Sequence, residues 1–94
     1  MTIRLVPDPQ VVSRRLEDQL VLVHLGTSRV YALNRTAARF WAHLISGGDL
    51  DEITRRMTDE FDVEAEALAR EIERLVGSLR TEQLVHEELA GRTR

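Results

Sequence analysis

The side chains that could carry out chemistry are few in kind and scattered along the chain. Histidine occurs at His24, His43 and His86, without the close spacing of metal sites built on one element. Cysteine is absent, which excludes disulfides, thiolate metal sites and a cysteine nucleophile. All 13 basic residues are arginine, so Schiff-base chemistry and the phosphate-binding lysine of P-loops are excluded as well. The sequence predicts no cofactor and no metal site.

The carboxylates are numerous, but they stand where helices need negative charge. Asp49 and Glu52 have the three-residue spacing of a capping box, and Asp62 precedes another helical run. The serines have no nucleophile-elbow context, and no glycine-rich loop connects a strand to a helix. We therefore expect a protein that is not an enzyme.

The charge of the chain argues against nucleic-acid binding. The 16 acidic residues give a net charge of −3, whereas binding to duplex nucleic acid is usually driven by a basic surface. A winged-helix regulator would have to present Arg70, Arg74 and Arg80 to DNA, from a helix that also carries four glutamates. We prefer a solvated helix with glutamate–arginine pairs, and a small DNA-binding regulator stays as the alternative.

The size and composition fit one soluble domain. Ninety-four residues with 43% hydrophobic and 31% charged side chains can form a single small core. The longest apolar runs, such as residues 20–23, are far shorter than the roughly 20 residues that a membrane span needs. The first residues also lack the apolar core of a signal peptide. We expect a cytoplasmic protein with no membrane partner.

Three short runs in the first third of the chain have the pattern of β-strands. Residues 11–16 are rich in β-branched side chains but include two arginines, which indicates an edge strand. Residues 19–25 are apolar on both faces and should form the central strand. Residues 26–28 then make a hairpin turn before a third strand over residues 29–33. The economical arrangement is a three-stranded antiparallel meander.

Three amphipathic helices follow the strands. Asn34 can cap the first helix, which Gly47 and Gly48 end. Asp49 should cap the second helix and Asp62 the third. One apolar stripe runs along the third helix and consists of Ala65, Leu68, Ala69, Ile72, Leu75, Val76 and Leu79. The predicted fold class is α+β, a three-stranded antiparallel sheet followed by three helices in a winged helix-turn-helix-like arrangement.

The two ends of the chain lack a clear pattern. Residues 1–10 contain two prolines and are predicted to be a flexible N-terminal arm. Residues 11–85 should form the folded domain, in which Leu84 and Val85 either add one short strand or fill the core. Residues 86–94 are polar and are predicted to be a disordered tail.

The order of these features is similar to that of a known family. The residues that carry the similarity are Tyr31-Ala32-Leu33-Asn34, Ala37, Trp41, Gly47-Gly48, Glu71-Ile72, Leu75-Val76, Leu79 and Leu84-Val85. In order and spacing they resemble the PqqD-like family, whose members are recognition elements for ribosomally synthesised and post-translationally modified peptides (RiPPs). The resemblance covers residues 11–85.

This resemblance implies both a fold and a function. It implies three strands followed by three helices, and an activity of binding without catalysis. The leader segment of a precursor peptide would add as a further strand beside residues 29–33, in a groove walled by the third helix. Glu71 stands where the family has an acidic residue, commonly aspartate.

The resemblance also implies partners. Stand-alone members work in lasso-peptide pathways, with a separate leader peptidase, and in pyrroloquinoline quinone synthesis. We favour the lasso-peptide type, in which the protein hands the precursor to a leader peptidase or another modifying enzyme. A PqqD-type peptide chaperone of pyrroloquinoline quinone synthesis is the alternative.

The physics of an edge strand supports such a site. The third strand borders the meander, so its free amides and carbonyls are a template for one more strand, from a peptide or from a second copy of the chain in a homodimer. Along it, Tyr31 and Leu33 share one face and Val30 and Ala32 the other. The predicted peptide-binding residues are Arg29, Val30, Tyr31, Ala32 and Leu33 on the strand, and Ala67, Leu68, Glu71, Ile72, Arg74 and Leu75 on the third helix.

Periodicity leaves two points open on the helix. Leu68, Ile72 and Leu75 equally suit a purely structural role in the core. The opposite flank, with Ala69, Glu73, Val76 and Arg80, is the alternative wall of the groove. We choose the first flank because Glu71 lies on it.

Overall fold

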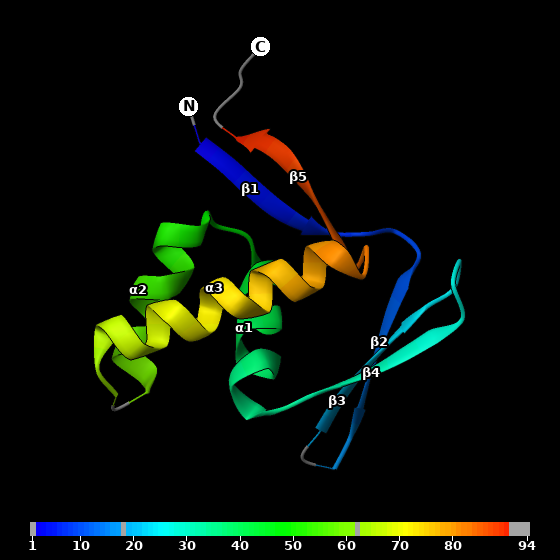
Figure 1. The fold of residues 1–94 in the computed structure, drawn as a ribbon, viewed down its shortest axis with the longest axis horizontal. Coiled ribbons are helices and arrows are strands. Elements are labelled where there is room, and N and C mark those ends of the chain that lie inside the picture. The colour runs from blue at the N-terminus through cyan, green and yellow to red at the C-terminus, as the bar shows by residue number, and fades with distance from the viewer. Residues whose placement is uncertain (1, 18, 62, 91–94) are drawn as a thin grey trace.

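The chain forms three helices packed against two small antiparallel sheets (Figure 1). A computed structural model describes residues 2–17, 19–61 and 63–90. The elements, in order, are β1 (Thr2–Pro7), β2 (Val11–Leu16), β3 (Gln19–His24), β4 (Arg29–Leu33), α1 (Arg35–Ser46), α2 (Leu50–Glu60), α3 (Ala65–Thr81) and β5 (Val85–Ala90).

The three-stranded sheet has the order β2-β3-β4, and both pairs of strands are antiparallel. In the central strand β3, Leu20, Leu22 and His24 are buried, while Val21 and Val23 between them are partly exposed. One face of the sheet therefore packs against the helices and the other faces solvent. The α+β class, with an antiparallel meander followed by three helices, is confirmed.

Side-chain caps begin the first two helices, as the sequence indicated. The Oδ1 atom of Asn34 accepts a hydrogen bond from the amide of Ala37 at 2.8 Å. Asp49 accepts from the amide of Glu52 at 2.9 Å, and Glu52 accepts from the amide of Asp49 at 3.1 Å, which completes the capping box. Asp62 lies outside the described residues, and the N-cap of α3 is Glu64.

The ends of the chain pair with each other in a second sheet. β1 runs antiparallel to β5, from Thr2 opposite Ala90 to Pro7 opposite Val85. Residues 2–7 thus form a strand where a flexible arm was expected over residues 1–10, and residues 85–90 form a strand that includes the first part of the tail expected over residues 86–94. Residues 91–94 lie outside the described residues. The pairing joins segments about as far apart as the chain allows, and local pattern carries little information on such contacts.

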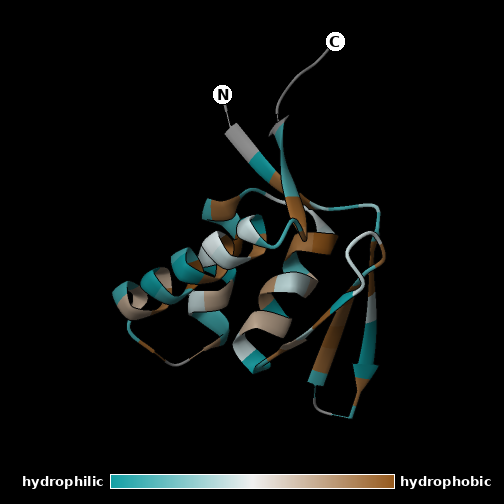
Figure 2. Ribbon diagram, turned by 45° about the vertical axis from the view of Figure 1, so that its right-hand side comes forward, coloured by the Kyte–Doolittle hydropathy of each residue, from teal (hydrophilic) through white to brown (hydrophobic). Residues whose placement is uncertain are grey.

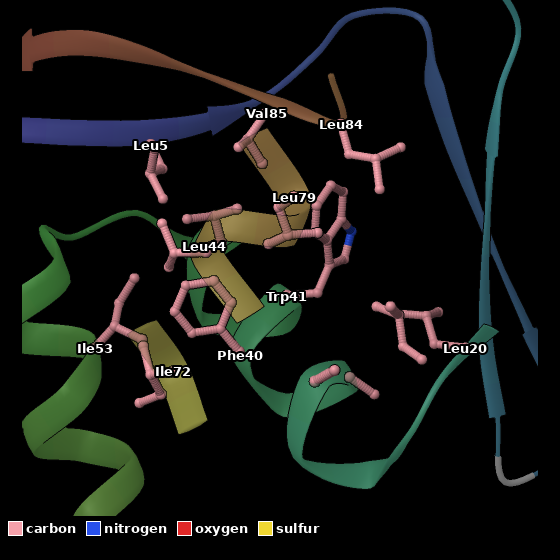
Figure 3. Packing of buried hydrophobic residues seen from close by; sticks show 14 of the residues in the cluster. Leu5, Leu20, Phe40, Trp41, Leu44, Ile53, Ile72, Leu79, Leu84 and Val85 are labelled. Carbon is pink, nitrogen blue, oxygen red and sulfur yellow. The ribbon is translucent and has the colours of Figure 1, made fainter. Parts of the chain in front are cut away.

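One hydrophobic core connects the helices to both sheets (Figure 3). Phe40, Leu22 and Ile53 are completely buried, and Leu5 of β1 is 2% exposed. Figure 2 shows hydrophilic and hydrophobic colours mixed along each helix, as expected for helices with one buried face. Among the described residues, no helix combines the length and apolar character needed to cross a membrane.

Candidate functional site

The three-stranded sheet has two outer edges, and they differ in charge. Within the described residues no strand pairs with the outer edge of β2 or of β4. β2 carries the exposed Arg14 and Arg15, whereas the charged residue of β4, Arg29, stands at its first position. Charged side chains along an edge strand discourage pairing with another chain. The edge of β4 is therefore the better template for an added strand.

The side chains of β4 alternate between the helices and solvent. Tyr31 is partly buried and Leu33 is 8% exposed, and both pack against the core. Val30, 63% exposed, and Ala32 lie on the opposite, solvent-facing side, and Arg29 is exposed at the start of the strand. A strand added beside β4 would place alternate side chains next to these two different surfaces.

The C-terminal end of α3 lies beside β4. Glu82, the residue directly after α3, contacts the side chains of Tyr31 and Arg29 on β4. At 3.6 residues per turn, Glu71 and Leu75 fall within about 40° of the direction of Glu82. Both are partly buried. They therefore share the side of the helix on which Glu82 contacts β4.

The other residues predicted on this side of α3 have different surroundings. Leu68 is 2% exposed and Ile72 is 5% exposed, so both belong to the core. Ala67 and Arg74 are exposed and border the stripe of Glu71 and Leu75. The surface that this face of the helix can offer to a ligand therefore comes from the residues at its rim.

The opposite flank of α3 faces α2. A hollow of about 330 Å³ lies between the two helices at this flank. Its lining residues are Leu50, Asp51, Thr54, Ala69, Arg70, Ile72, Glu73 and Val76. Ala69, Glu73 and Val76 belong to the flank that the sequence left as the alternative wall. These three residues therefore line the side of α3 that lies next to α2.

The space between β4 and α3 is closed at one end. Helix α3 packs against α1, α2 and β5, and its C-terminal end meets β4 through Glu82. Tyr31 Oη donates a hydrogen bond to Glu82 Oε1 at 2.7 Å, and the guanidinium of Arg29 donates to the same oxygen at 3.0 Å. A hollow of about 320 Å³ lies at this point, lined by Thr27, Arg29, Tyr31, Thr81, Glu82 and Gln83. We call the three joined side chains, Tyr31, Glu82 and Arg29, the β4–α3 tie.

The β4–α3 tie also changes proton affinities. The hydrogen bond from Tyr31 holds the pKa of Glu82 below its ordinary value, and the charge of Arg29 lowers it further. The same hydrogen bond, together with partial burial, raises the pKa of Tyr31. At neutral pH the tie therefore consists of a carboxylate, a protonated phenol and a guanidinium.

Sequence reasoning missed Glu82. Its partner Tyr31 lies 51 residues away, so no local pattern connects the two side chains. The helical spacing could have pointed to it, because Glu82 follows Glu71 by eleven residues, about three turns of helix, and so lies on the same side of α3.

The described part of the chain contains no cluster of three or more His, Cys, Asp or Glu side chains that could hold a metal ion.

Comparisons with known proteins identify the family of this chain and structures with a similar fold. The family model described as "Coenzyme PQQ synthesis protein D (PqqD)" matches residues 19–85. A search of curated proteins returned no match. One similar solved structure, described as "TbiB1 in Complex with the TbiA(beta) Leader Peptide", is 25% identical with a TM-score of 0.80, and the match covers 95% of this chain and 99% of that one.

A second solved structure is similar to the same extent. It is described as "Lasso peptide synthetase B1 complexed with the leader peptide" and is 26% identical, with a TM-score of 0.78. The match covers 92% of this chain and 99% of that one. The resemblance read from the sequence is confirmed, because the family model spans well over half of the chain. This protein belongs to the PqqD family.

Proposed function

We propose that this protein is a non-catalytic adaptor that binds the leader segment of a ribosomally synthesised precursor peptide as an added β-strand on β4. The observation that carries this proposal is the open edge of β4, whose Tyr31 and Arg29 contact Glu82 at the C-terminal end of α3. The fold is that of TbiB1, whose structure is a complex with a leader peptide. Main-chain hydrogen bonds would supply affinity, and side-chain contacts at alternate positions would supply selectivity.

The groove suggests what kind of peptide it accepts. Tyr31 and Leu75 offer partly apolar surface, while Glu71 and Arg74 add one charge of each sign at the rim. Such a surface suits a mostly hydrophobic segment with a few charged residues. An antiparallel guest would continue the meander and form the slightly more stable type of strand pair.

The partner enzyme belongs to the same proposal. A lasso-peptide leader peptidase, or another modifying enzyme, would receive the bound precursor in the cytoplasm. One of the two similar structures is that of a lasso peptide synthetase B1, which favours this pathway. The description of the matching family favours a second candidate, a peptide chaperone in pyrroloquinoline quinone synthesis. Pairing of β4 with a second copy of the chain would compete with either role.

Strand addition can be tested with peptides of two origins. The probes are the TbiA(beta) leader peptide and linear peptides selected on the wild-type protein from a random display library. In a pairing strand, only alternate amides point toward the partner. We expect N-methylation of one alternate set of peptide amides to abolish binding, measured by calorimetry, and N-methylation of the other set to leave it nearly unchanged. Equal effects of both sets would contradict strand addition.

The wall of the groove is tested on the protein side. Leu75→Arg places a long charged side chain on the side of α3 on which Glu82 contacts β4, so we expect a loss of peptide affinity of about tenfold or more. Glu73→Arg is the matched control, because Glu73 is exposed and lies on the flank toward α2. Melting temperatures of both variants show whether the fold is kept. Equal affinities of the two folded variants would exclude this wall.

A further inference from the structure

The β4–α3 tie joins the two walls of the proposed groove, β4 and the C-terminal end of α3, through polar side chains. The described hydrogen bonds and ion pairs include none that joins β4 to the helical residues 65–81 of α3. The tie combines a hydrogen bond to a charged oxygen with an ion pair on the same atom, Oε1 of Glu82. Charge-assisted hydrogen bonds of this kind are shorter and more directional than neutral ones.

The backbone around the tie is shaped by two turns. Ser28, just before β4, and Gln83, just after Glu82, both have a φ of 63°, in the left-handed region that residues other than glycine rarely adopt. The hollow at the tie is lined by residues of both turns. The turn at Ser28 leads into β4, and the turn at Gln83 follows Glu82 at the end of α3. The β4–α3 tie therefore joins the two elements at the point where these turns come together.

From this geometry we propose that Glu82 is a positioning residue that sets the width of the groove, by holding the C-terminal end of α3 against Tyr31 and Arg29 of β4. The inference rests on the proposed function and adds a residue to it. Binding is tighter when a site is already held in its bound shape, because less freedom is lost on binding. An exposed ion pair adds little to stability, so the main effect of Glu82 is on the geometry of the site.

The existence of the tie in solution can be measured without any peptide. Tyr31 is the only tyrosine of the chain, so the absorbance change on ionisation of tyrosine reports on this side chain alone. The side chains in contact with its hydroxyl region are Glu82 and Arg29. We expect Tyr31 to ionise at a higher pH in the wild type than in Glu82→Ala, because the hydrogen bond to the carboxylate stabilises the protonated phenol. The same titration curve in both proteins would overturn the inference.

A matched control is available at the same end of α3. Arg80 forms an ion pair with Glu87 of β5 at 2.6 Å, and both side chains are about as exposed as those of the tie. Glu87→Ala removes this pair without touching the groove. It should leave the titration of Tyr31 unchanged.

The role of the tie in binding is tested with the peptides selected on the wild-type protein. We expect Tyr31→Phe and Glu82→Ala to weaken peptide binding about three- to tenfold, the scale of ordering one or two side chains. Glu87→Ala should bind like the wild type. Because Tyr31→Phe keeps the ring and removes only the hydroxyl group, its melting temperature should stay close to that of the wild type.

A charge reversal separates positioning from a general loss of structure. Arg29→Glu and Glu82→Arg each place like charges together and should weaken binding, whereas the double variant restores an attractive pair and should recover much of the affinity. Unchanged affinity in Tyr31→Phe and Glu82→Ala, or no recovery in the double variant, would overturn the inference. If no peptide bound the wild type in the first place, the proposed function would fail instead, and the tyrosine titration would still decide whether the tie exists.

Discussion

At the scale of single residues, Glu60 connects two helices through its carboxylate. It accepts a hydrogen bond from Arg39 and lies 3.0 Å from Nε2 of His43, both on α1, while Glu60 itself ends α2. The hydrogen bond with Arg39, followed by that with His43, lowers the pKa of Glu60 from its ordinary value. The folded protein therefore binds a proton at Glu60 less readily than the unfolded chain does.

This lowered pKa predicts a pH dependence of stability. The contribution of Glu60 is fully present above the pKa of the unfolded chain and is lost as the pH falls through the lower pKa of the folded state. We expect Glu60→Gln to lower the free energy of unfolding at neutral pH by no more than about 1 kcal/mol, because the group is partly exposed. In strongly acidic solution the two proteins should become equally stable. Urea unfolding at several pH values measures this, and a difference that persisted in acid would contradict the assignment.

Residue-scale features were predictable where the partners are neighbours in sequence. The caps at Asn34 and Asp49 involve amides three residues away, so residue type and spacing were sufficient. The contact of Glu82 with Tyr31 depends on how α3 is placed against β4. No local pattern contains that placement, and this is why the sequence singled out Arg29 and Tyr31 but not their contact with Glu82.

At the scale of elements, the contrast between the two edges of the sheet has a consequence for association. The two arginines at positions 14 and 15 of β2 are exposed, and they would repel the same residues of a second copy pairing along this edge. We expect the double variant Arg14→Val and Arg15→Val to self-associate, as seen by sedimentation velocity, at concentrations where the wild type does not.

The control for this experiment lies on α2. Arg55 and Arg56 are a second pair of adjacent, exposed arginines, and a helix offers no free strand edge. Replacing both with valine should leave the state of association unchanged. If this control associated as strongly as the β2 variant, general surface hydrophobicity rather than strand pairing would be the cause.

The elements themselves were largely predictable from local pattern. Alternation and β-branched residues marked β2, β3 and β4, and helical spacing with caps marked the three helices. β1 was missed, and β5 was anticipated only as a possible short strand at Leu84 and Val85, because each strand finds its partner at the far end of the chain. Two prolines near β1 also suggested an irregular segment, although Pro7 only ends that strand.

At the scale of the whole molecule, charge is distributed unevenly along the chain. Residues 1–48 contain six arginines and three acidic residues, whereas residues 49–94 contain seven arginines and thirteen acidic residues. In a winged-helix protein α3 would be the element to enter DNA, and here it belongs to the acidic half. The excess of acidic residues in this half of the chain would repel phosphates.

This distribution predicts weak binding to nucleic acid. In a salt titration with duplex DNA, followed by fluorescence anisotropy, we expect no binding that depends steeply on salt concentration. Tight binding that fell sharply with added salt would favour a DNA-binding regulator over a peptide adaptor. The peptide experiments on the same preparation show that the protein is folded and active.

The pairing of β1 with β5 has one more consequence. Thr2 lies opposite Ala90, at the end of the ribbon that extends away from β2, β3 and β4 (Figure 1). The described chain thus enters and leaves the domain at neighbouring points, remote from the β4 edge. A fluorescent label, a surface anchor or a second protein could be attached at these neighbouring points. The β4 edge would stay exposed to solvent in such a fusion.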